Sequence, residues 1–164
     1  MKRVFLFLVV CLLFVAANTP ASAGWTITYL NPSGATFSYA NGIFNTQQVG
    51  YALGNRNHAG LWSGTANSWK DLNPNAATNS YANGTSGSQQ VGYATVGGHD
   101  HASLWSGTSA SWVDLNPSGA IYSYARGMSG GQQAGTAFFA GHWHAGFWSG
   151  TAGSWVDLNY PLGR

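Results

Sequence analysis

The chain has 164 residues, of which 45% are hydrophobic, 15% aromatic and only 6% charged, and its formal net charge at pH 7 is +2. This aromatic content excludes a disordered chain, because disordered segments are poor in aromatic residues. The few Lys and Arg residues form no basic cluster. The sequence therefore argues against a nucleic-acid partner, which requires positive charge along the phosphates, and against electrostatic docking to a membrane.

The first 23 residues have the pattern of a secretory signal peptide. Lys2 and Arg3 precede an uncharged apolar run at 4–17, and the small residues Ala-Ser-Ala at 21–23 precede the expected cleavage point. The apolar run is short for a membrane span, which needs about 20 residues. We therefore expect export with removal of residues 1–23, a secreted, extracellular or periplasmic location, and no membrane span in the mature chain.

Removal of this segment changes the charge and the cysteine content. The mature chain, 24–164, carries four cationic and four anionic side chains, so its net charge is zero. Cys11 is the only cysteine and leaves with the signal peptide, so the mature chain has none to form a disulfide, although an oxidising compartment would permit one. Its 141 residues suffice for one domain that buries roughly two-thirds of its unfolded surface.

The mature chain begins with a segment that predicts a strand. Residues 24–30 alternate and contain β-branched and aromatic side chains. An Asn-Pro pair follows Leu30, just as one follows Leu72 and Leu115. We interpret 24–31 as an orphan strand, the last strand of a repeat whose earlier strands are missing.

The remainder of the chain is a threefold repeat. The motif His-Ala-x-[Leu/Phe]-Trp-Ser-Gly-Thr begins at His58, His101 and His144, and each histidine lies 43 residues from the next. A fixed period of this size indicates a repeat architecture. We place the repeats at 32–73, 74–116 and 117–159, followed by a tail at 160–164.

Each repeat contains four short segments of strand character, separated by polar turns such as Ser-Gly-Thr. They carry, in order, Ser-Tyr-Ala-x-Gly, Gln-Gln-[Val/Ala]-Gly, His-Ala-x-[Leu/Phe]-Trp and Ser-Trp-x-Asp-Leu. No window of helical length shows an apolar period of about 3.6 residues. In the first repeat we expect strands near 36–43, 47–52, 58–62 and 68–72.

Four strands in such a repeat are typical of a β-propeller blade, and we predict an all-β, propeller-like repeat protein with three four-stranded blades plus the N-terminal extra strand. In the third strand Ala102 and Leu104 lie on one face and Trp105 on the other, as expected for a sheet covered on both faces. Glycines in the strands allow backbones to approach closely. The alternatives are a parallel β-helix, whose turns are shorter and lack hairpins, and a β-sandwich, which lacks the strict repeat.

Three blades are fewer than the roughly four to eight of a closed propeller. Open sheet edges promote association with other chains. We therefore expect either a homo-oligomer that closes the ring, most simply two chains of three blades each, or a fragment of a longer array. In the first case the segment 25–30 is expected to pair with a blade of the partner chain.

The repeat resembles the bacterial extracellular repeats of the HAF family, named for a His-Ala-Phe core followed by Leu-Trp. The matching residues are His101-Ala102, Leu104-Trp105, Gln90-Val91-Gly92 and Asp114-Leu115. Gly60, Ser103 and Gly146 stand where the family has phenylalanine. The resemblance covers nearly all of the mature chain. It implies an exported, propeller-like protein and carries no assigned chemistry, so no catalytic residue is transferred.

The recurring His, Ser and Asp residues invite comparison with a Ser-His-Asp triad. Each recurs in all three copies, whereas an active site needs its groups once, so we interpret the repeated His and Asp as structural residues that hydrogen-bond within or between blades. The sequence has no Gly-x-Ser-x-Gly, no His-Glu-x-x-His and no phosphate-binding loop. We expect no enzyme, no catalytic residue and no cofactor.

Two His-x-His segments raise the question of a metal site. They lie at 99–101 and 142–144 and place two imidazoles on one face of a strand. The first repeat has Arg56 where the others have the first histidine, and no third ligand is evident. We assign no metal site.

Two groups of residues are candidates for ligand binding. The loop before the motif histidine differs between copies, at 53–57, 95–100 and 138–143, and variable loops on a rigid scaffold often carry function; drift is the alternative. A tryptophan also follows each polar turn, and its face would suit a sugar ring unless it is core between blades. The candidate ligand-binding residues are Trp69, Trp112, Trp155, His99, Asp100 and Trp143.

We expect a secreted, non-enzymatic repeat protein that acts as a binding or interaction module, for carbohydrate or for a protein ligand. The alternatives are a purely structural extracellular or surface component and a secreted hydrolase. Glycan binding with one weak site per blade would favour the first, and hydrolysis of a glycan or an ester would favour the last.

Overall fold

The computed structural model describes residue 24 and residues 26–159. The signal peptide predicted at 1–23, Trp25 and the tail at 160–164 lie outside the described residues. The described chain forms three four-stranded antiparallel sheets. The first sheet consists of β1 (Phe37–Phe44), β2 (Gln47–Leu53), β3 (Asn57–Trp62) and β4 (Lys70–Asp71). The second consists of β5 (Ala77–Thr85), β6 (Gln90–Val96), β7 (His99–Trp105) and β8 (Val113–Asp114). The third consists of β9 (Tyr122–Ser129), β10 (Gln132–Phe139), β11 (His142–Trp148) and β12 (Val156–Asp157).

The predicted all-β chain with three four-stranded sheets is confirmed, but the fourth strand of each sheet is shorter than expected. A 3-10 helix precedes it: η1 (Ala66–Ser68), η2 (Ser109–Ser111) or η3 (Ala152–Ser154). In the first sheet the Ser68 hydroxyl donates to the Thr65 carbonyl at 2.6 Å and accepts from the Ser63 N–H at 2.7 Å. These bonds hold the turn closed, so that only two residues remain to pair with β3.

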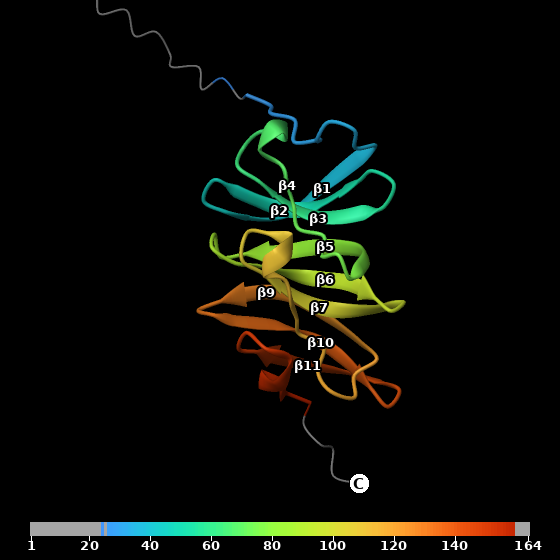
Figure 1. Ribbon diagram of the computed structural model, residues 1–164. Coiled ribbons are helices and arrows are strands. Elements are labelled where there is room, and N and C mark those ends of the chain that lie inside the picture. Colours follow the sequence, from blue (N-terminus) through green and yellow to red (C-terminus); the bar gives the residue numbers. More distant parts are fainter. Residues whose placement is uncertain (1–23, 25, 160–164) are drawn as a thin grey trace, which may run out of the picture.

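The sheets stack face to face in chain order, with the first and third sheets at opposite ends (Figure 1). Strand β5 lies against β1, β2 and β3 of the first sheet, and β9 lies against β5, β6 and β7 of the second. The three sheets do not close into a ring. Packing of four-stranded sheets on one another is shared with propeller blades, but closure of a propeller is not a property of this single chain.

The orphan strand predicted at 24–31 does not form in the single chain. None of the described residues of that segment is in a strand, and Ile27 and Tyr29 are 79% and 82% exposed. A strand requires a partner edge, and this segment pairs with none. Instead, the Asn31 side-chain amide donates to the Ala35 carbonyl at 2.9 Å and Pro32 is buried, so the chain turns directly into β1.

Each sheet has a forward face, which points toward the next sheet, and a rear face, which points toward the preceding one. Both interfaces join the forward face of one sheet to the rear face of the next. The first interface contains Val49, Ala59, Leu61 and Leu72 of the first sheet and Ala82, Ala94 and Trp105 of the second. The second contains Val91, Ala102, Leu104 and Leu115 of the second sheet and Ala125 and Trp148 of the third. As predicted, β7 contributes to both cores.

A buried serine connects the backbones across each interface. The Ala59 N–H donates to the Ser80 hydroxyl at 2.9 Å, and that hydroxyl donates to the Asn73 side-chain oxygen at 2.6 Å. In the second interface the Ala102 N–H, Ser123 and Asn116 repeat the arrangement, at 2.9 and 2.6 Å. Ser80 and Ser123 are both 0% exposed. The serine hydroxyl therefore replaces the water that a backbone N–H would bind in the unfolded chain.

We predict that Ser80→Ala lowers the free energy of unfolding by about 1–3 kcal/mol, because it leaves the Ala59 N–H and the Asn73 oxygen buried without this partner. Urea unfolding at neutral pH measures the loss. Ser38→Ala, measured at a concentration at which the protein is monomeric, is the matched control, since Ser38 holds the same repeat position in a sheet that has no preceding sheet. Equal losses in the two variants would contradict the role given to Ser80.

Glycine is required in the second strand of each sheet because the edge strand passes very close to it. A Cβ added at Gly50, Gly92 or Gly135 would lie 1.8 or 1.9 Å from a tyrosine carbonyl oxygen of the neighbouring strand. The pairing register of those two strands shifts beside the same residues in all three sheets. The repeated glycine therefore serves the close backbone approach that the sequence predicted.

We predict that Gly92→Ala destabilises the protein by about 1–3 kcal/mol or more, because relief of the overlap requires the backbone to move. Gly153→Ala, a substitution with no atom within 4 Å of the added Cβ, is expected to change stability by less than about 0.5 kcal/mol. Thermal and urea unfolding of both variants provide the measurement. Near-neutral behaviour of Gly92→Ala would show that the strands can separate at no cost.

Candidate functional site

A continuous series of aromatic rings crosses the three sheets. Tyr39 and Tyr51 lie opposite each other on β1 and β2 and stack, with ring centroids 5.1 Å apart. Tyr81 and Tyr93 do the same on β5 and β6, at 4.7 Å. Tyr51 and Tyr81 meet edge to face at 4.8 Å, which joins the two pairs. We call the rings of Tyr39, Tyr51, Tyr81, Tyr93, Tyr124 and Trp143 the aromatic stripe.

The stripe changes where it reaches the third sheet. Tyr93 meets Tyr124 edge to face at 4.8 Å, but the residue opposite Tyr124 is Thr136, where the other sheets have a tyrosine. Trp143 instead approaches Tyr124, with centroids 5.6 Å apart. In the first two sheets the tyrosines cover each other's faces. In the third sheet this stacked pair is missing, and Trp143 remains 51% exposed.

Trp143 is the centre of an aromatic cluster that we call the Trp143 platform. Its ring lies 5.0 Å from Phe138 and 6.5 Å from Tyr122. His99, from the second sheet, packs edge to face on Tyr122 at 5.1 Å. The members of the platform are Trp143, Tyr122, Tyr124, Phe138, His99 and Asp100. The site thus combines an exposed indole with an imidazole and a carboxylate from the neighbouring sheet.

Asp100 links the second and third sheets at this site. Its carboxylate accepts a hydrogen bond from the Tyr124 hydroxyl at 3.0 Å and another from the Thr95 hydroxyl at 2.7 Å. Asn57 holds the same repeat position and donates to the Tyr81 hydroxyl at 2.8 Å. Trp143 occupies this position in the third repeat. In the first two repeats the residue at this position therefore contacts the following sheet. In the third repeat the position holds the exposed ring of Trp143.

Two tyrosines of the stripe, Tyr93 and Tyr124, have a raised pKa that favours their neutral form. Burial raises the pKa of Tyr124 to about 12, aided by the hydrogen bond to Asp100 and by its negative charge. Arg126, whose guanidinium carbon lies 4.8 Å from the Tyr124 ring centre, opposes this shift. Burial likewise raises the pKa of Tyr93 to about 12, with further contributions from Tyr81 and Asp100. At neutral pH these side chains therefore act as hydroxyl donors.

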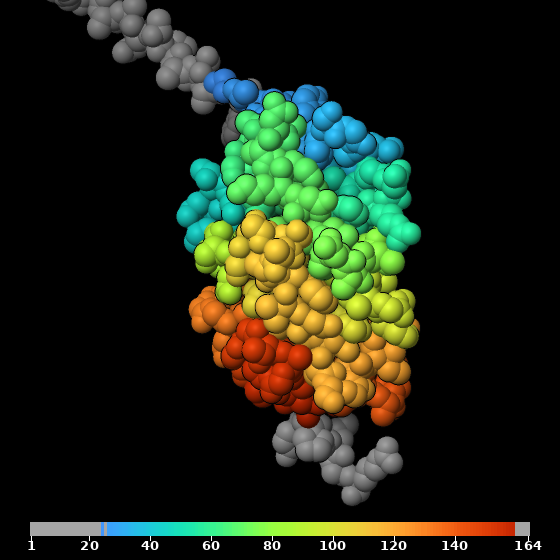
Figure 2. Space-filling model, in the orientation of Figure 1, coloured from blue at the N-terminus to red at the C-terminus, as the bar shows by residue number. Residues whose placement is uncertain are grey.

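The structure brings three of the six candidate residues together, since His99, Asp100 and Trp143 all belong to the platform. Trp112 and Trp155 are instead half-buried and pack against the first and second cores. The Trp112 indole N–H donates to the Ser103 hydroxyl at 2.9 Å. Figure 2 shows the segments that contain η1, η2 and η3, in green, yellow and red, one below another on the visible face. Trp112 and Trp155, which follow η2 and η3, thus contribute to packing between sheets.

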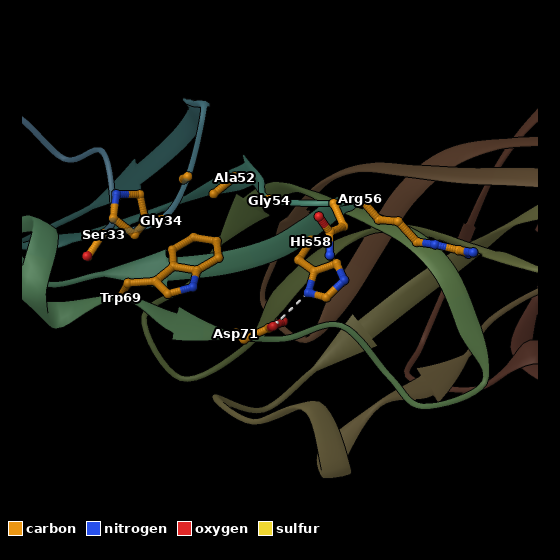
Figure 3. Close-up of a pocket in the computed structure, with 11 residues that line it drawn as sticks. Ser33, Gly34, Ala52, Gly54, Arg56, His58, Trp69 and Asp71 are labelled. Atoms are coloured by element: carbon orange, nitrogen blue, oxygen red, sulfur yellow. Dashed lines mark hydrogen bonds and ion pairs between the residues drawn. The ribbon is translucent and has the colours of Figure 1, made fainter.

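Trp69 borders an open pocket of about 500 Å³ on the rear face of the first sheet. Ala52, His58 and Asp71 also line it, and the Arg56 side chain extends away from Trp69 (Figure 3). The indole of Trp69 covers Gly60 so closely that a Cβ there would lie 2.1 Å from it. The pocket exists because no sheet precedes the first one in the described chain.

Each sheet pairs its motif histidine with the aspartate of its short last strand, whereas the sequence predicted only that both residues hydrogen-bond within or between blades. The Nδ1–Oδ2 distances are 2.7, 2.8 and 2.5 Å for His58–Asp71, His101–Asp114 and His144–Asp157. The second carboxylate oxygen accepts the N–H of an asparagine two residues on, as in Asp71 and Asn73 at 2.7 Å. The pair therefore anchors the end of β4, β8 and β12 to the neighbouring strand.

Two further observations bear on the chemistry of the site. In the described part of the chain no serine hydroxyl is hydrogen-bonded to a histidine ring. Within residues 24 and 26–159 no group of three or more His, Cys, Asp or Glu side chains is placed to hold a metal ion. The two histidines at 99 and 101 therefore make different contacts: His99 packs on Tyr122, while His101 is hydrogen-bonded to Asp114.

The sequence analysis did not select Tyr122 and Tyr124 as site residues, and it included Phe138 only as part of the variable segment 138–143. The spacing of Tyr122 and Tyr124 carries a signal, because residues two apart in a strand share a face. This spacing does not indicate whether another sheet covers that face. Tyr81 lies in the same motif as Tyr124, but its ring stacks on Tyr93. The third copy differs because it is the last sheet of the stack, which the motif itself does not reveal.

No family model, curated protein or solved structure matches this chain at a significant level. Among the described residues there is also no helix whose length and apolar character would let it cross a membrane.

We predict that Tyr93 and Tyr124 ionise only near pH 12, compared with the ordinary value of 10.0. Spectrophotometric titration of tyrosinate in the native protein and in Tyr124→Phe isolates the second group. Because the folded pKa is raised, the stabilisation is complete below the unfolded pKa of about 10 and is lost as pH rises from there to about 12. A Tyr124 contribution that titrates near pH 10 would contradict this.

Proposed function

We propose that this protein is an exported, non-enzymatic repeat module that binds carbohydrate through the Trp143 platform. The observation that carries the proposal is the half-exposed indole of Trp143, fixed by Phe138, Tyr122 and Tyr124. A sugar ring has an apolar face that suits such a rigid aromatic surface and hydroxyl groups that require polar partners at its rim. His99 and Asp100 supply polar groups beside the aromatic rings.

The rigidity of the platform supports a binding role. Trp143 lies in β11, and its aromatic neighbours lie in β9 and β10, so regular strands hold all the rings. Asp100 is fixed by two hydrogen bonds and is a residue of β7. Ligand binding to such a surface costs little conformational entropy, because the side chains are already ordered.

Export and a propeller-like assembly belong to the same proposal. The basic, apolar and small-residue pattern of residues 1–23 supports export. The resemblance to HAF repeats supports an extracellular role and blade-like sheets. Face-to-face stacking of four-stranded sheets is compatible with propeller blades, and three sheets leave both end faces available to complete a larger assembly.

We expect the purified protein to be retained by at least one of three insoluble polysaccharides, namely cellulose, chitin and xylan. Trp143→Ala is expected to weaken that binding about tenfold or more, which corresponds to about 1.4 kcal/mol. Depletion isotherms over a range of polysaccharide concentrations measure the effect. Tyr29→Ala serves as control, because this exposed ring lies in the coil before β1 and outside the platform.

Two results would contradict the proposal. One is that none of the three polysaccharides retains the protein. The other is that Trp143→Ala and Tyr29→Ala bind as tightly as the unaltered protein, since the exposed indole would then play no part in retention.

A further inference from the structure

We infer that the two end faces of the stack bind each other in different copies of this chain, the forward face of the third sheet against the rear face of the first sheet of a second copy. The interface would repeat the two that already exist inside the chain. The proposed partner is therefore a second copy, joined head to tail. This inference does not depend on carbohydrate binding.

The forward face of the third sheet carries the residues that are buried in the equivalent faces. Ala145 corresponds to Ala59 and Ala102, and Leu158 corresponds to Leu72 and Leu115. The four equivalents are all 0% exposed, whereas Ala145 is exposed and Leu158 is 61% exposed. These apolar side chains stand in the positions of a sheet interface without a covering sheet.

The rear face of the first sheet is the matching half. Ala40 corresponds to Ala82 and Ala125, which are 0% exposed, yet Ala40 is exposed. The open pocket near Trp69 lies on this face and is lined by Ala35 and Ala52. Inside the chain, the core that contains Leu72 is formed with the equivalents of those three residues, namely Ala77, Ala94 and Trp112. The pocket therefore has the place and lining to receive Leu158 of another copy.

The two end faces also carry the polar groups that form hydrogen bonds in the internal interfaces. Ser38 and Asn31 correspond to Ser80 and Asn73. The Asn31 side-chain amide donates to the Ala35 carbonyl at 2.9 Å, and the equivalent residues Asn73 and Asn116 make the same bond. Within the described chain no following sheet offers a serine to the Ala145 N–H, the counterpart of the Ala59 N–H. Head-to-tail stacking would bring Ser38 of the second copy to it.

The geometry favours unlike faces over like faces. Each internal interface joins a face rich in Leu and Val to a face of small residues and tryptophan, so the two halves differ. Such heterologous contacts yield a closed ring when the rotation between copies closes, and a filament when it does not. The contact would also place Tyr39 of one copy beside Trp143 of another, because Asn57 and Asp100, at the same repeat position, contact the tyrosine of the following sheet. Association and polysaccharide binding would then compete for the Trp143 side chain.

The test uses one variant for each end. Leu158→Asp blocks the forward end, and Ala40→Arg blocks the rear end; both residues are exposed, so the fold of the single chain should persist. We expect the unaltered protein to associate in a concentration-dependent way by light scattering after size exclusion. Each variant alone should be a monomer. An equimolar mixture should form a dimer, because each variant retains the face that the other lacks.

Controls separate this inference from general surface effects and from the proposed function. Ala110→Arg makes the same chemical change at an exposed alanine of η2, away from both end faces, and should associate normally. Polysaccharide retention by the two monomeric variants shows whether carbohydrate binding survives without association. Circular dichroism and urea unfolding of each variant establish that it is folded.

Three results would overturn the inference. The unaltered protein could remain a monomer at all concentrations up to its solubility limit. Leu158→Asp could abolish association while Ala40→Arg leaves it intact, which would indicate contact between two like faces. The mixture of the two folded variants could also fail to form a dimer, in which case the forward and rear faces do not recognise each other.

Discussion

The structure depends on a backbone N–H group that only the next sheet can satisfy. In the first interface the Ala59 N–H of β3 donates to the buried Ser80 hydroxyl of β5, which passes the bond on to Asn73. A buried donor without a partner costs about 1–3 kcal/mol, so the sheets cannot slide or separate without that loss. The bond therefore fixes the position of each sheet relative to its neighbour.

The same constraint explains the composition of the repeat. The sheets can approach closely enough for a serine hydroxyl to reach a backbone N–H because alanine and glycine occupy much of the space between them. Leucine and tryptophan then fill the remaining volume, with Leu72, Leu115, Trp105 and Trp148 fully buried between the sheets. The side chains that cannot be covered collect where the stack ends, and both the Trp143 platform and the two complementary end faces lie in such places.

Much of the site followed from comparing the copies with one another. The differing loops at 53–57, 95–100 and 138–143 include Asn57, Asp100 and Trp143, which face the neighbouring sheet or solvent. The repeated His and Asp residues hydrogen-bond within each sheet, as expected. The roles of the other tryptophans could not be predicted, because Trp69, Trp112 and Trp155 have the same motif but different neighbours. Trp112 and Trp155 have a preceding sheet to pack against, whereas Trp69 borders an open pocket.

The sequence by itself determined the repeat, its four strands and the residues of the two apolar faces, because strand alternation and a fixed period are local properties of the chain. It did not determine which faces are covered, since Ala59 and Ala145 hold the same position of the repeated motif and only Ala59 has a following sheet in the described chain. It also suggested a strand at 24–31 that lacks a partner edge. Only the tertiary structure decided these points, because burial and pairing depend on neighbours that are distant in sequence or belong to another molecule.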